Sequence, residues 1–343
     1  MAYQVGGLKT GSITIGSGSL SQAGEIAKKL ISQGKPARAL IVCGSVMIRS
    51  DAYQKLTGYL QEAGIAAESF SGVEPEPSIN TAQKCADAIH EGGYGLVIGF
   101  GGGSALDVAK VAAVTAGKGR VYDFAGIGKV HEKGLPMLFI PTTSGSGSES
   151  TLSALLSDTD AGGIKKGYVS HFMLPDAAII DAETTLSLPP KSTAATGIDA
   201  LIHALESFVS RKATPMSDAL AIDAIRRIGR SLRKAYANGS DLKAREDMAA
   251  ASAMAGICIG NSGLGLVHAM ALPMGGLFNI IHGISNAVLL PFVLDFNLMA
   301  APEKYAAAAE ALGEDITGLS AIEQARLIVP AVRGCGRFLG QSR

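Results

Sequence analysis

One aspartate and three histidines in the C-terminal half have the residue types and the spacing of metal ligands. Asp199 and His203 stand at positions i and i+4, so on a helix both side chains project from the same face. His268 and His282 lie in later apolar stretches. A lone histidine in such surroundings is more often a core residue, but a buried aspartate is costly unless it is paired or binds a metal. One carboxylate and three imidazoles would suit Fe²⁺, Zn²⁺ or a similar divalent ion acting as a Lewis acid, and a core role stays open.

The remaining histidines and the cysteines show no ligand pattern. We expect three histidines at the surface or in loops, namely His90, His131 and His171. The cysteines are Cys43, Cys85, Cys258 and Cys335. They lie far apart and form no CxxC pair, which argues against a cysteine-rich metal site and favours reduced thiols in the core.

A glycine-rich loop follows an apolar strand expected at residues 96–100. It reads Gly99-Phe100-Gly101-Gly102-Gly103-Ser104, and a helix is expected to start near Ala105. Backbone N–H groups at a helix N-terminus can approach a pyrophosphate closely when glycines leave room, which favours a dinucleotide site. The spacing is not the GxGxxG fingerprint, and a plain tight turn is the alternative. Asp107 and Lys110 follow, and their positions alone favour a solvated helix face.

A second loop of small and polar residues follows the strand expected at 137–140. It reads Pro141-Thr142-Thr143-Ser144-Gly145-Ser146-Gly147-Ser148-Glu149. Hydroxyls and exposed amides at the carboxyl edge of a parallel sheet are where α/β folds bind ligands. A flexible linker would have a similar composition. Two such loops leaving neighbouring strands at one edge favour the ligand interpretation.

Strand-like and helix-like segments alternate through the first half and must position both loops. Further expected strands are 39–43 and 68–70, and the expected helices are 20–33, 53–63 and one that Ser78 caps and that runs through His90. This alternation predicts a doubly wound parallel α/β layer. After Pro189-Pro190, residues 191 to about 332 are rich in Ala, Leu, Met and Ile at helical spacing. We therefore expect an α/β dinucleotide-binding domain at 1–190 and an all-α metal-binding domain at 191–343.

The composition narrows the class of protein. The 343 residues carry no net charge at pH 7 and are 47% hydrophobic, so we expect a packed globule without affinity for nucleic acid. Apolar runs such as 39–43 and 287–293 are far shorter than the ~20 residues of a membrane helix, so we expect no membrane span. Residues 1–5 lack a secretory signal pattern, which predicts a cytoplasmic protein.

At these motifs the chain resembles the iron-dependent, or group III, alcohol dehydrogenase family. The resemblance runs to about residue 330. Its motifs are Gly101-Gly102-Gly103-Ser104 with Asp107 and Lys110, Pro141-Thr142-Thr143 to Glu149, Gly197-Ile198-Asp199-Ala200 with His203, and His268-Ala269-Met270 leading to His282-Gly283-Ile284-Ser285-Asn286-Ala287-Val288-Leu289-Leu290-Pro291. It implies an N-terminal dinucleotide-binding domain, a helical second domain, and cofactor and metal in the cleft between them.

The resemblance also implies roles for individual residues. The metal ligands would be Asp199, His203, His268 and His282, and Fe²⁺ would be the ion, with Zn²⁺ or another divalent ion possible. NAD(H) or NADP(H) would contact Gly44, Ser45, Gly101, Gly102, Gly103, Ser104, Asp107, Thr142, Thr143, Ser146 and Lys165. Lys165 resembles a lysine near the cofactor ribose, and a solvated loop lysine is the alternative. The implied reaction is hydride transfer between the nicotinamide and a small alcohol or aldehyde whose oxygen the metal polarises. A homo-oligomer, a dimer or larger, is implied too.

Three features depart from the family pattern. Leu272 stands where relatives commonly carry a histidine assigned to proton relay, so protons must take another path or the reaction differs. Gly44-Ser45 replaces an aspartate that many NAD-preferring relatives place after that strand, so Ser45 or Arg49 could accept the 2′-phosphate of NADP(H). Relatives usually continue with more helical sequence, whereas residues 334–343 are glycine-rich. Either a truncated or altered reading frame, or function without those helices, would account for this.

Two alternatives to an alcohol dehydrogenase remain at this point. One is a glycerol dehydrogenase-like or dehydroquinate synthase-like member that handles a polyol or sugar acid at Zn²⁺. The other is a cofactor-binding homologue with impaired turnover, which Leu272 would suggest and the retention of all four ligand-type residues argues against. Apolar residues near the histidines suggest a pocket for a small uncharged substrate, namely Met270, Met274, Phe278 and Ile281.

Overall fold

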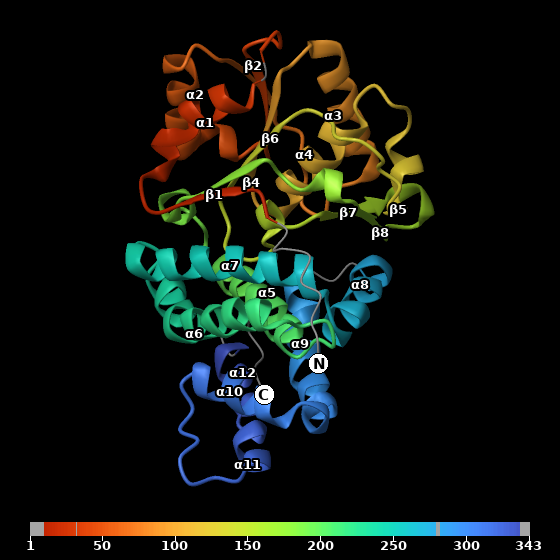
Figure 1. The fold of residues 1–343 in the computed structure, drawn as a ribbon. Coiled ribbons are helices and arrows are strands. Elements are labelled where there is room, and N and C mark those ends of the chain that lie inside the picture. Colours follow the sequence, from red (N-terminus) through yellow and green to blue (C-terminus); the bar gives the residue numbers. More distant parts are fainter. Residues whose placement is uncertain (1–9, 32, 279–281, 337–343) are drawn as a thin grey trace. The chain divides into compact units, whose positions relative to one another are not determined.

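The computed structural model describes residues 10–31, 33–278 and 282–336, and the side chains of 275–278 and 335–336 are outside this description (Figure 1). The chain divides into two compact units. The α/β unit comprises Thr10–Thr143 and Ser148–Thr185, and the helical unit includes Ser144–Gly147 and the chain from Leu186 onward. Of the glycine-rich tail at 334–343, which was expected to break the helical pattern, residues 334–336 are described and end a helix, and 337–343 lie outside the described residues, as do the N-terminal residues 1–5.

A six-stranded parallel sheet forms the centre of the α/β unit, in the order β1-β9-β6-β4-β2-β3. Its strands are β1 Ser12–Ile15, β2 Arg38–Val42, β3 Ala66–Phe70, β4 Leu96–Gly101, β6 Met137–Pro141 and β9 Ala177–Ile180. The central strands are buried along their whole length, which explains why they are continuous apolar runs rather than alternating patterns. Strand β4 pairs with β6 in the register Ile98 to Leu138.

Helices cover both faces of this sheet (Figure 1). One face packs against α1 Ala23–Leu30 and α2 Asp51–Glu62, and the other against α3 Ile79–Gly92 and α4 Gly103–Thr115. The hydroxyl of Ser78 accepts the N–H of Thr81, so the predicted N-cap of α3 is confirmed. The prediction of a doubly wound parallel layer is confirmed.

Two local predictions for this unit differ from the structure. The helix expected at 20–33 starts only at Ala23, because the Asp181 carboxylate accepts the N–H groups of Gly18 and Leu20 and holds the preceding turn as a 3₁₀ segment. A second sheet, in the order β5-β8-β7, was not expected. Its strands are β5 Gly126–Ile127, β7 Ser153–Asp158 and β8 Ile164–Val169. Strands β7 and β8 are antiparallel and joined by a short turn that contains Gly162 and Gly163 in left-handed conformations.

The helical unit packs around α5, Pro190–Phe208, which is buried over most of its length. The others are α6 Pro215–Ala237, α7 Leu242–Ser262, α8 Leu266–Phe278, α9 His282–Asn297, α10 Pro302–Ala311, α11 Ala321–Arg326 and α12 Ile328–Gly336. Two of these helices have clear start signals. Pro190 occupies the first turn of α5, and Asp241 caps α7 by accepting the N–H of Ala244. Helices α7 and α8 meet at a bend of 100°. The helical second unit is as predicted.

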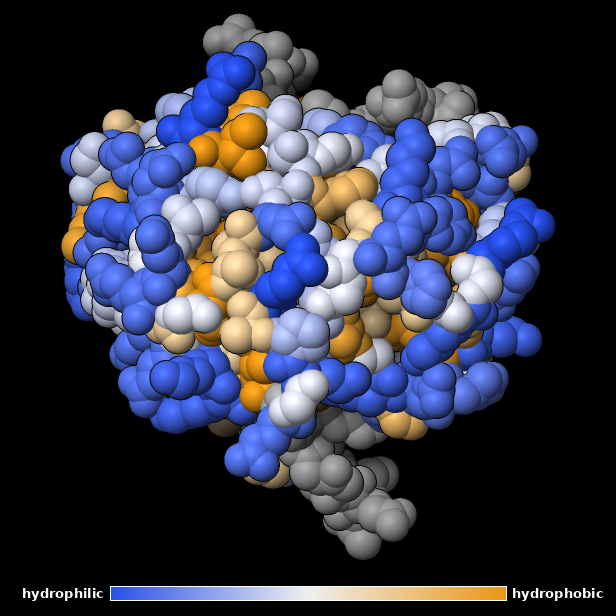
Figure 2. All heavy atoms as spheres, turned by 90° about the horizontal axis from the view of Figure 1, so that it is seen from above, coloured by the Kyte–Doolittle hydropathy of each residue, from blue (hydrophilic) through white to orange (hydrophobic). Residues whose placement is uncertain are grey.

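One described segment, His282–Ala300, is long and apolar enough to cross a membrane by length and composition. Half of its most apolar window is buried inside the protein, as in core helices of soluble proteins that meet the same criteria. On the face drawn in Figure 2, hydrophilic residues predominate and hydrophobic ones lie in smaller areas between them.

Candidate active site

Helix α5 supplies two of the four predicted ligand residues. Asp199 and His203 are one turn apart, and Asp199 Oδ1 lies 3.9 Å from His203 Nε2. Both side chains are buried, on a helix that packs against α6, α7 and α9. The i, i+4 spacing therefore brings them to one face, as the sequence predicts.

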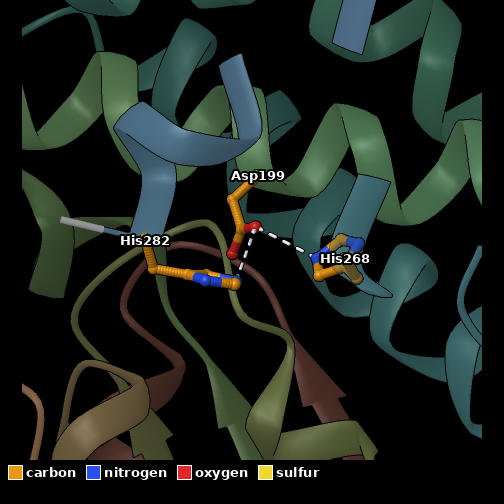
Figure 3. Close-up of side chains that lie close together, drawn as sticks. All are labelled: Asp199, His268 and His282. Carbon is orange, nitrogen blue, oxygen red and sulfur yellow. Dashed lines mark ion pairs between the residues drawn. The ribbon is translucent and has the colours of Figure 1, made fainter. Parts of the chain in front are cut away.

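The other two histidines come from the first turns of α8 and α9. His268 Nε2 lies 3.5 Å and His282 Nε2 lies 3.8 Å from the same oxygen, Asp199 Oδ1. Figure 3 shows Asp199 between the two rings. The rings of His203 and His268 stack with centroids 4.6 Å apart. The ligand atoms of Asp199, His268 and His282 thus form one close group in the helical unit, and His203 joins it through its 3.9 Å contact with Asp199 Oδ1.

Three residues around this point were not singled out from the sequence. Glu206 Oε2 lies 2.7 Å from His268 Nδ1, and the carbonyl of Gly145 lies 3.3 Å from His203 Nδ1. Asn286 donates from Nδ2 to Asp199 Oδ1 at 2.8 Å, and the same nitrogen lies 3.1 Å from His282 Nε2. The signal for Glu206 and Asn286 was available, because each follows a predicted ligand by one helical turn on the same helix. Gly145 had no such signal.

Electrostatics within the cluster favour an ionised aspartate. Burial works against ionisation, yet the neighbouring imidazoles hold the pKa of Asp199 well below its usual range. Burial lowers the pKa of His203 to about 4, which keeps that ring neutral at pH 7. Burial opposes a charge on His268, but the carboxylates of Asp199 and Glu206 outweigh it and raise its pKa to about 9. The Asp199 carboxylate and the neutral His203 ring can bind a divalent cation directly, and His268 would release a proton when it binds one.

In the α/β unit, the two glycine- and hydroxyl-rich loops are neighbours. They follow β4 and β6, which are adjacent in the sheet, and Thr142 donates its N–H to the carbonyl of Gly101. Gly101 has φ +155°, and a Cβ there would lie 2.8 Å from the Ala105 Cβ, so only glycine fits. Gly102 is the N-cap of α4, whose first N–H groups have no carbonyl partner within the helix. The expected adjacency at one sheet edge is confirmed.

The expectation of a solvated helix face for Asp107 and Lys110 was wrong. Lys110 is fully buried, and its Nζ donates to backbone and hydroxyl oxygens of Ser148 and Thr151 and to the carbonyl of Ser153. Asp107 accepts from the Ser148 hydroxyl and from a backbone N–H of β7. Burial is possible because every donor of the ammonium finds an oxygen. The pair therefore fixes α4 to the chain that follows the second loop.

The remaining predicted cofactor residues lie as follows. Gly44 is half-buried after β2 and Ser45 is exposed. Thr142 is buried, and Thr143, Gly103 and Ser104 are half-buried. Ser146 belongs to the segment Ser144–Gly147, grouped with the helical unit, where Gly147 at φ +61° packs against Gly256. The Lys165 ammonium donates to Ser157 and pairs with Glu76, so the expectation of a purely solvated lysine does not describe it.

The expectations for the remaining histidines and for three of the cysteines are confirmed, and the expected substrate pocket stays a prediction. His90, His131 and His171 are exposed. Cys43, Cys85 and Cys258 are buried free thiols, and the Cys335 side chain is outside the description. Leu272 and Met274 are half-buried on α8, Met270 is exposed, and the Phe278 and Ile281 side chains lie outside the described residues.

Comparison with known proteins places these motifs in a family. Residues 10–182 match the model of iron-containing alcohol dehydrogenase, and residues 193–342 match the Fe-containing alcohol dehydrogenase family, C-terminal model. The chain belongs to the iron-containing alcohol dehydrogenase family. It is therefore an oxidoreductase of the alcohol dehydrogenase class, and the resemblance inferred from the motifs is confirmed.

Relatives and a solved structure agree with this family assignment. The chain is 44% identical over 314 residues to long-chain-alcohol dehydrogenase 1 of Geobacillus thermodenitrificans (strain NG80-2), a match covering 90% of this chain and 78% of that protein. It is 36% identical to the NAD-dependent methanol dehydrogenase of Bacillus methanolicus over 95% of this chain and 84% of that protein. The crystal structure of a 1,3-propanediol oxidoreductase superposes with a TM-score of 0.92 at 39% identity, covering 97% of this chain and 86% of that chain. The iron-containing alcohol dehydrogenase fold is thus shared almost throughout the chain.

Proposed function

We propose that this iron-containing alcohol dehydrogenase interconverts a small primary alcohol and its aldehyde with a nicotinamide dinucleotide, at a divalent metal held by Asp199, His203, His268 and His282. The observation that carries the proposal is the convergence of three imidazole nitrogens on one carboxylate oxygen, at 3.5, 3.8 and 3.9 Å. The helical unit would then be the metal-binding domain and the α/β unit the dinucleotide-binding domain.

The donor set suits the proposed ion. Ligands about 2.1 Å from one metal are themselves separated by distances close to those that Asp199 makes with the three rings. The ligand atoms of Asp199, His268 and His282 all lie within 4.8 Å of one another. Nitrogen and carboxylate donors fit Fe²⁺ and also Zn²⁺. A divalent cation supplies Lewis acidity, which polarises an alcohol or carbonyl oxygen.

For the dinucleotide, the support is the pair of adjacent loops in the α/β unit. Gly101 to Ser104 present backbone N–H groups at the start of α4, which would receive the pyrophosphate. Thr142 and Thr143 follow the neighbouring strand and would contact the cofactor, as would Ser146. In the oxidative direction the carbinol carbon loses a hydride to the nicotinamide and the hydroxyl loses a proton, which solvent takes up.

We further propose that NADP(H) is accepted beside NAD(H). Ser45 is exposed directly after β2, and Gly44-Ser45 offers no carboxylate to repel a 2′-phosphate. The 3₁₀ turn Met47–Arg49 that follows ends at Arg49, which is also exposed and could donate to that phosphate. The names of the relatives range from long-chain alcohols to methanol, so family membership alone does not give the length of the substrate.

The assembly of the enzyme and its place in the cell belong to the same proposal. We expect two or more copies of the chain to assemble, and we expect the enzyme to work in the cytoplasm. Light scattering of the purified protein measures the first, and fractionation of producing cells measures the second. A strictly monomeric active enzyme would contradict the assembly proposal.

The deciding experiment combines metal content with turnover. The purified enzyme should contain about one Fe²⁺ or Zn²⁺ per chain. It should oxidise NADH or NADPH with short aldehydes, and removal of metal by a chelator should abolish this until the ion is restored. Asp199→Asn should bind little metal and have no measurable activity. Full turnover by the chelated enzyme would overturn the proposal.

A further inference from the structure

Glu206 lies at the junction of two helices that carry proposed metal ligands. It follows Asp199 and His203 on the same face of α5, and its side chain is buried. Its Oε1 accepts the N–H of Val267, and its Oε2 accepts the N–H of Gly265 and contacts His268 Nδ1 at 2.7 Å. One carboxylate thus engages both the start of α8 and the ring of the ligand residue in its first turn.

An ionised carboxylate can only accept hydrogen bonds, so Nδ1 of His268, which faces Glu206, carries a proton. When the ring gives up its other proton to bind a metal, its lone pair is therefore on Nε2. Nε2 is the atom that lies 3.5 Å from Asp199 Oδ1. The amide nitrogen of Asn286 lies 3.4 Å from the same atom.

We propose that Glu206 is a positioning residue of the metal centre, which holds the His268 ring in the orientation and tautomer that present Nε2 to the ion. The proposal rests on the metal site proposed above. A carboxylate behind a ligating imidazole both orients the ring and raises its basicity. The close approach is built into the backbone, because a Cβ at Gly265 would lie 2.8 Å from Glu206 Oε1.

The competing interpretation is purely structural. Glu206 accepts two N–H groups at the N-terminus of α8, where a negative charge also interacts favourably with the helix dipole. Removal of the side chain would therefore weaken the fold whatever its role at His268. Because Oε2 serves both Gly265 and His268, the test needs a variant that keeps the size of the side chain and the bond to Val267, together with a control for the loss of one hydrogen bond.

Glu206→Gln is the closest such variant. Its amide oxygen at the Oε1 position can still accept the N–H of Val267. Its NH₂ group at the Oε2 position would lose the N–H of Gly265 and face Nδ1 as a donor, which favours the tautomer with the proton on Nε2. We expect the affinity for Zn²⁺, measured by competition with a chelator, to fall about 10- to 100-fold. Glu206→Asp keeps the charge with a shorter reach and should lose less affinity than Glu206→Gln.

A matched control separates position from stability. The Ser210 hydroxyl donates to the carbonyl of Ser262 at 2.7 Å and so joins the end of α5 to the end of α7. Ser210→Ala should lower the thermal midpoint and leave Zn²⁺ affinity unchanged. An equal loss of Zn²⁺ affinity in Ser210→Ala and Glu206→Gln would show that Glu206 acts only through stability.

A spectroscopic readout tests the tautomer directly. In Zn²⁺-loaded wild-type protein labelled with ¹⁵N-histidine, the Nδ1 proton of His268 should resonate far downfield, as for a strong charge-assisted hydrogen bond. That signal should disappear in Glu206→Gln. If the wild type binds no Zn²⁺, the metal site itself fails. If the wild type binds Zn²⁺, the metal site stands. The role of Glu206 then fails if Glu206→Gln binds Zn²⁺ equally well, or if the wild type shows no downfield proton.

Discussion

Asn286 Nδ2 donates a hydrogen bond to Asp199 Oδ1 across 2.8 Å, which joins α9 to α5 at the centre of the proposed metal site. The asparagine is fully buried, and its own Oδ1 has no hydrogen-bond partner among the described residues. Because its Nδ2 donates to Asp199 Oδ1, Asn286 belongs with the residues that orient the Asp199 carboxylate.

Asn286→Ala should weaken metal binding. The buried Asp199 carboxylate would lose a neutral donor that orients it, at a cost of about 1–3 kcal/mol, so we expect about a tenfold lower metal affinity. Equilibrium competition with a chelator measures this. Asn80→Ala is the control, because it removes an exposed amide that donates to Thr159 within the α/β unit. Unchanged metal affinity in Asn286→Ala would contradict the prediction.

Leu272→His should change the pH dependence of turnover. Leu272 is half-buried on α8 and has no group that carries protons. A histidine there titrates near pH 6.5, so a new inflection should appear in kcat between about pH 6 and 7. Met216→His adds the same group at an exposed position of α6 and should leave the profile unchanged. A profile identical to that of the wild type would count against a proton relay at position 272.

Ser45→Asp should shift the cofactor preference toward NADH. A carboxylate at this exposed position after β2 would repel a 2′-phosphate, so kcat/KM for NADPH relative to NADH should fall about 10- to 100-fold. Ser21→Asp serves as the control, because it adds the same charge at an exposed site in the turn that precedes α1. Strict selectivity of the wild type for NADH would refute the proposal that NADP(H) is accepted.

Glu149→Gln should stabilise the protein at neutral pH and not at acid pH. Burial raises the pKa of Glu149 to about 7, above the 4.5 of an exposed glutamate. Between these values the folded state holds a proton that the unfolded state has released, so stability falls as pH rises from 4.5 to 7. The variant lacks this penalty. Its unfolding free energy should match that of the wild type near pH 4.5 and exceed it by about 1–3 kcal/mol near pH 7.5.

Denaturant titrations across this pH range check the prediction for Glu149. Burial lowers the pKa of nearby Lys110 to about 8, so most of its titration lies above the range. Glu183→Gln removes an exposed carboxylate paired with Lys55 and should show no such pH dependence. A difference between Glu149→Gln and wild type that is the same at both pH values would show that ionisation of Glu149 is not the cause.

Local patterns in the sequence determined the elements and the ligand types. Continuous apolar runs predicted the buried parallel strands β2, β4 and β6, and the i, i+4 spacing placed Asp199 and His203 on one helix face. These features depend on periodicity over a few residues, which the sequence displays directly. The short β7–β8 hairpin was missed, because its strands depend on pairing with each other more than on their own pattern.

Only the tertiary structure decided which partners surround the site. Helix α8 must bend 100° from α7 before Glu206 can reach His268, and α9 must lie against α5 before Asn286 can reach Asp199. Burial of Lys110 required five oxygens from a segment that lies far along the chain. The sequence therefore determined which residues could do chemistry. Packing between distant segments decided their hydrogen bonds, their burial and their charge states, because these depend on neighbours that no local pattern specifies.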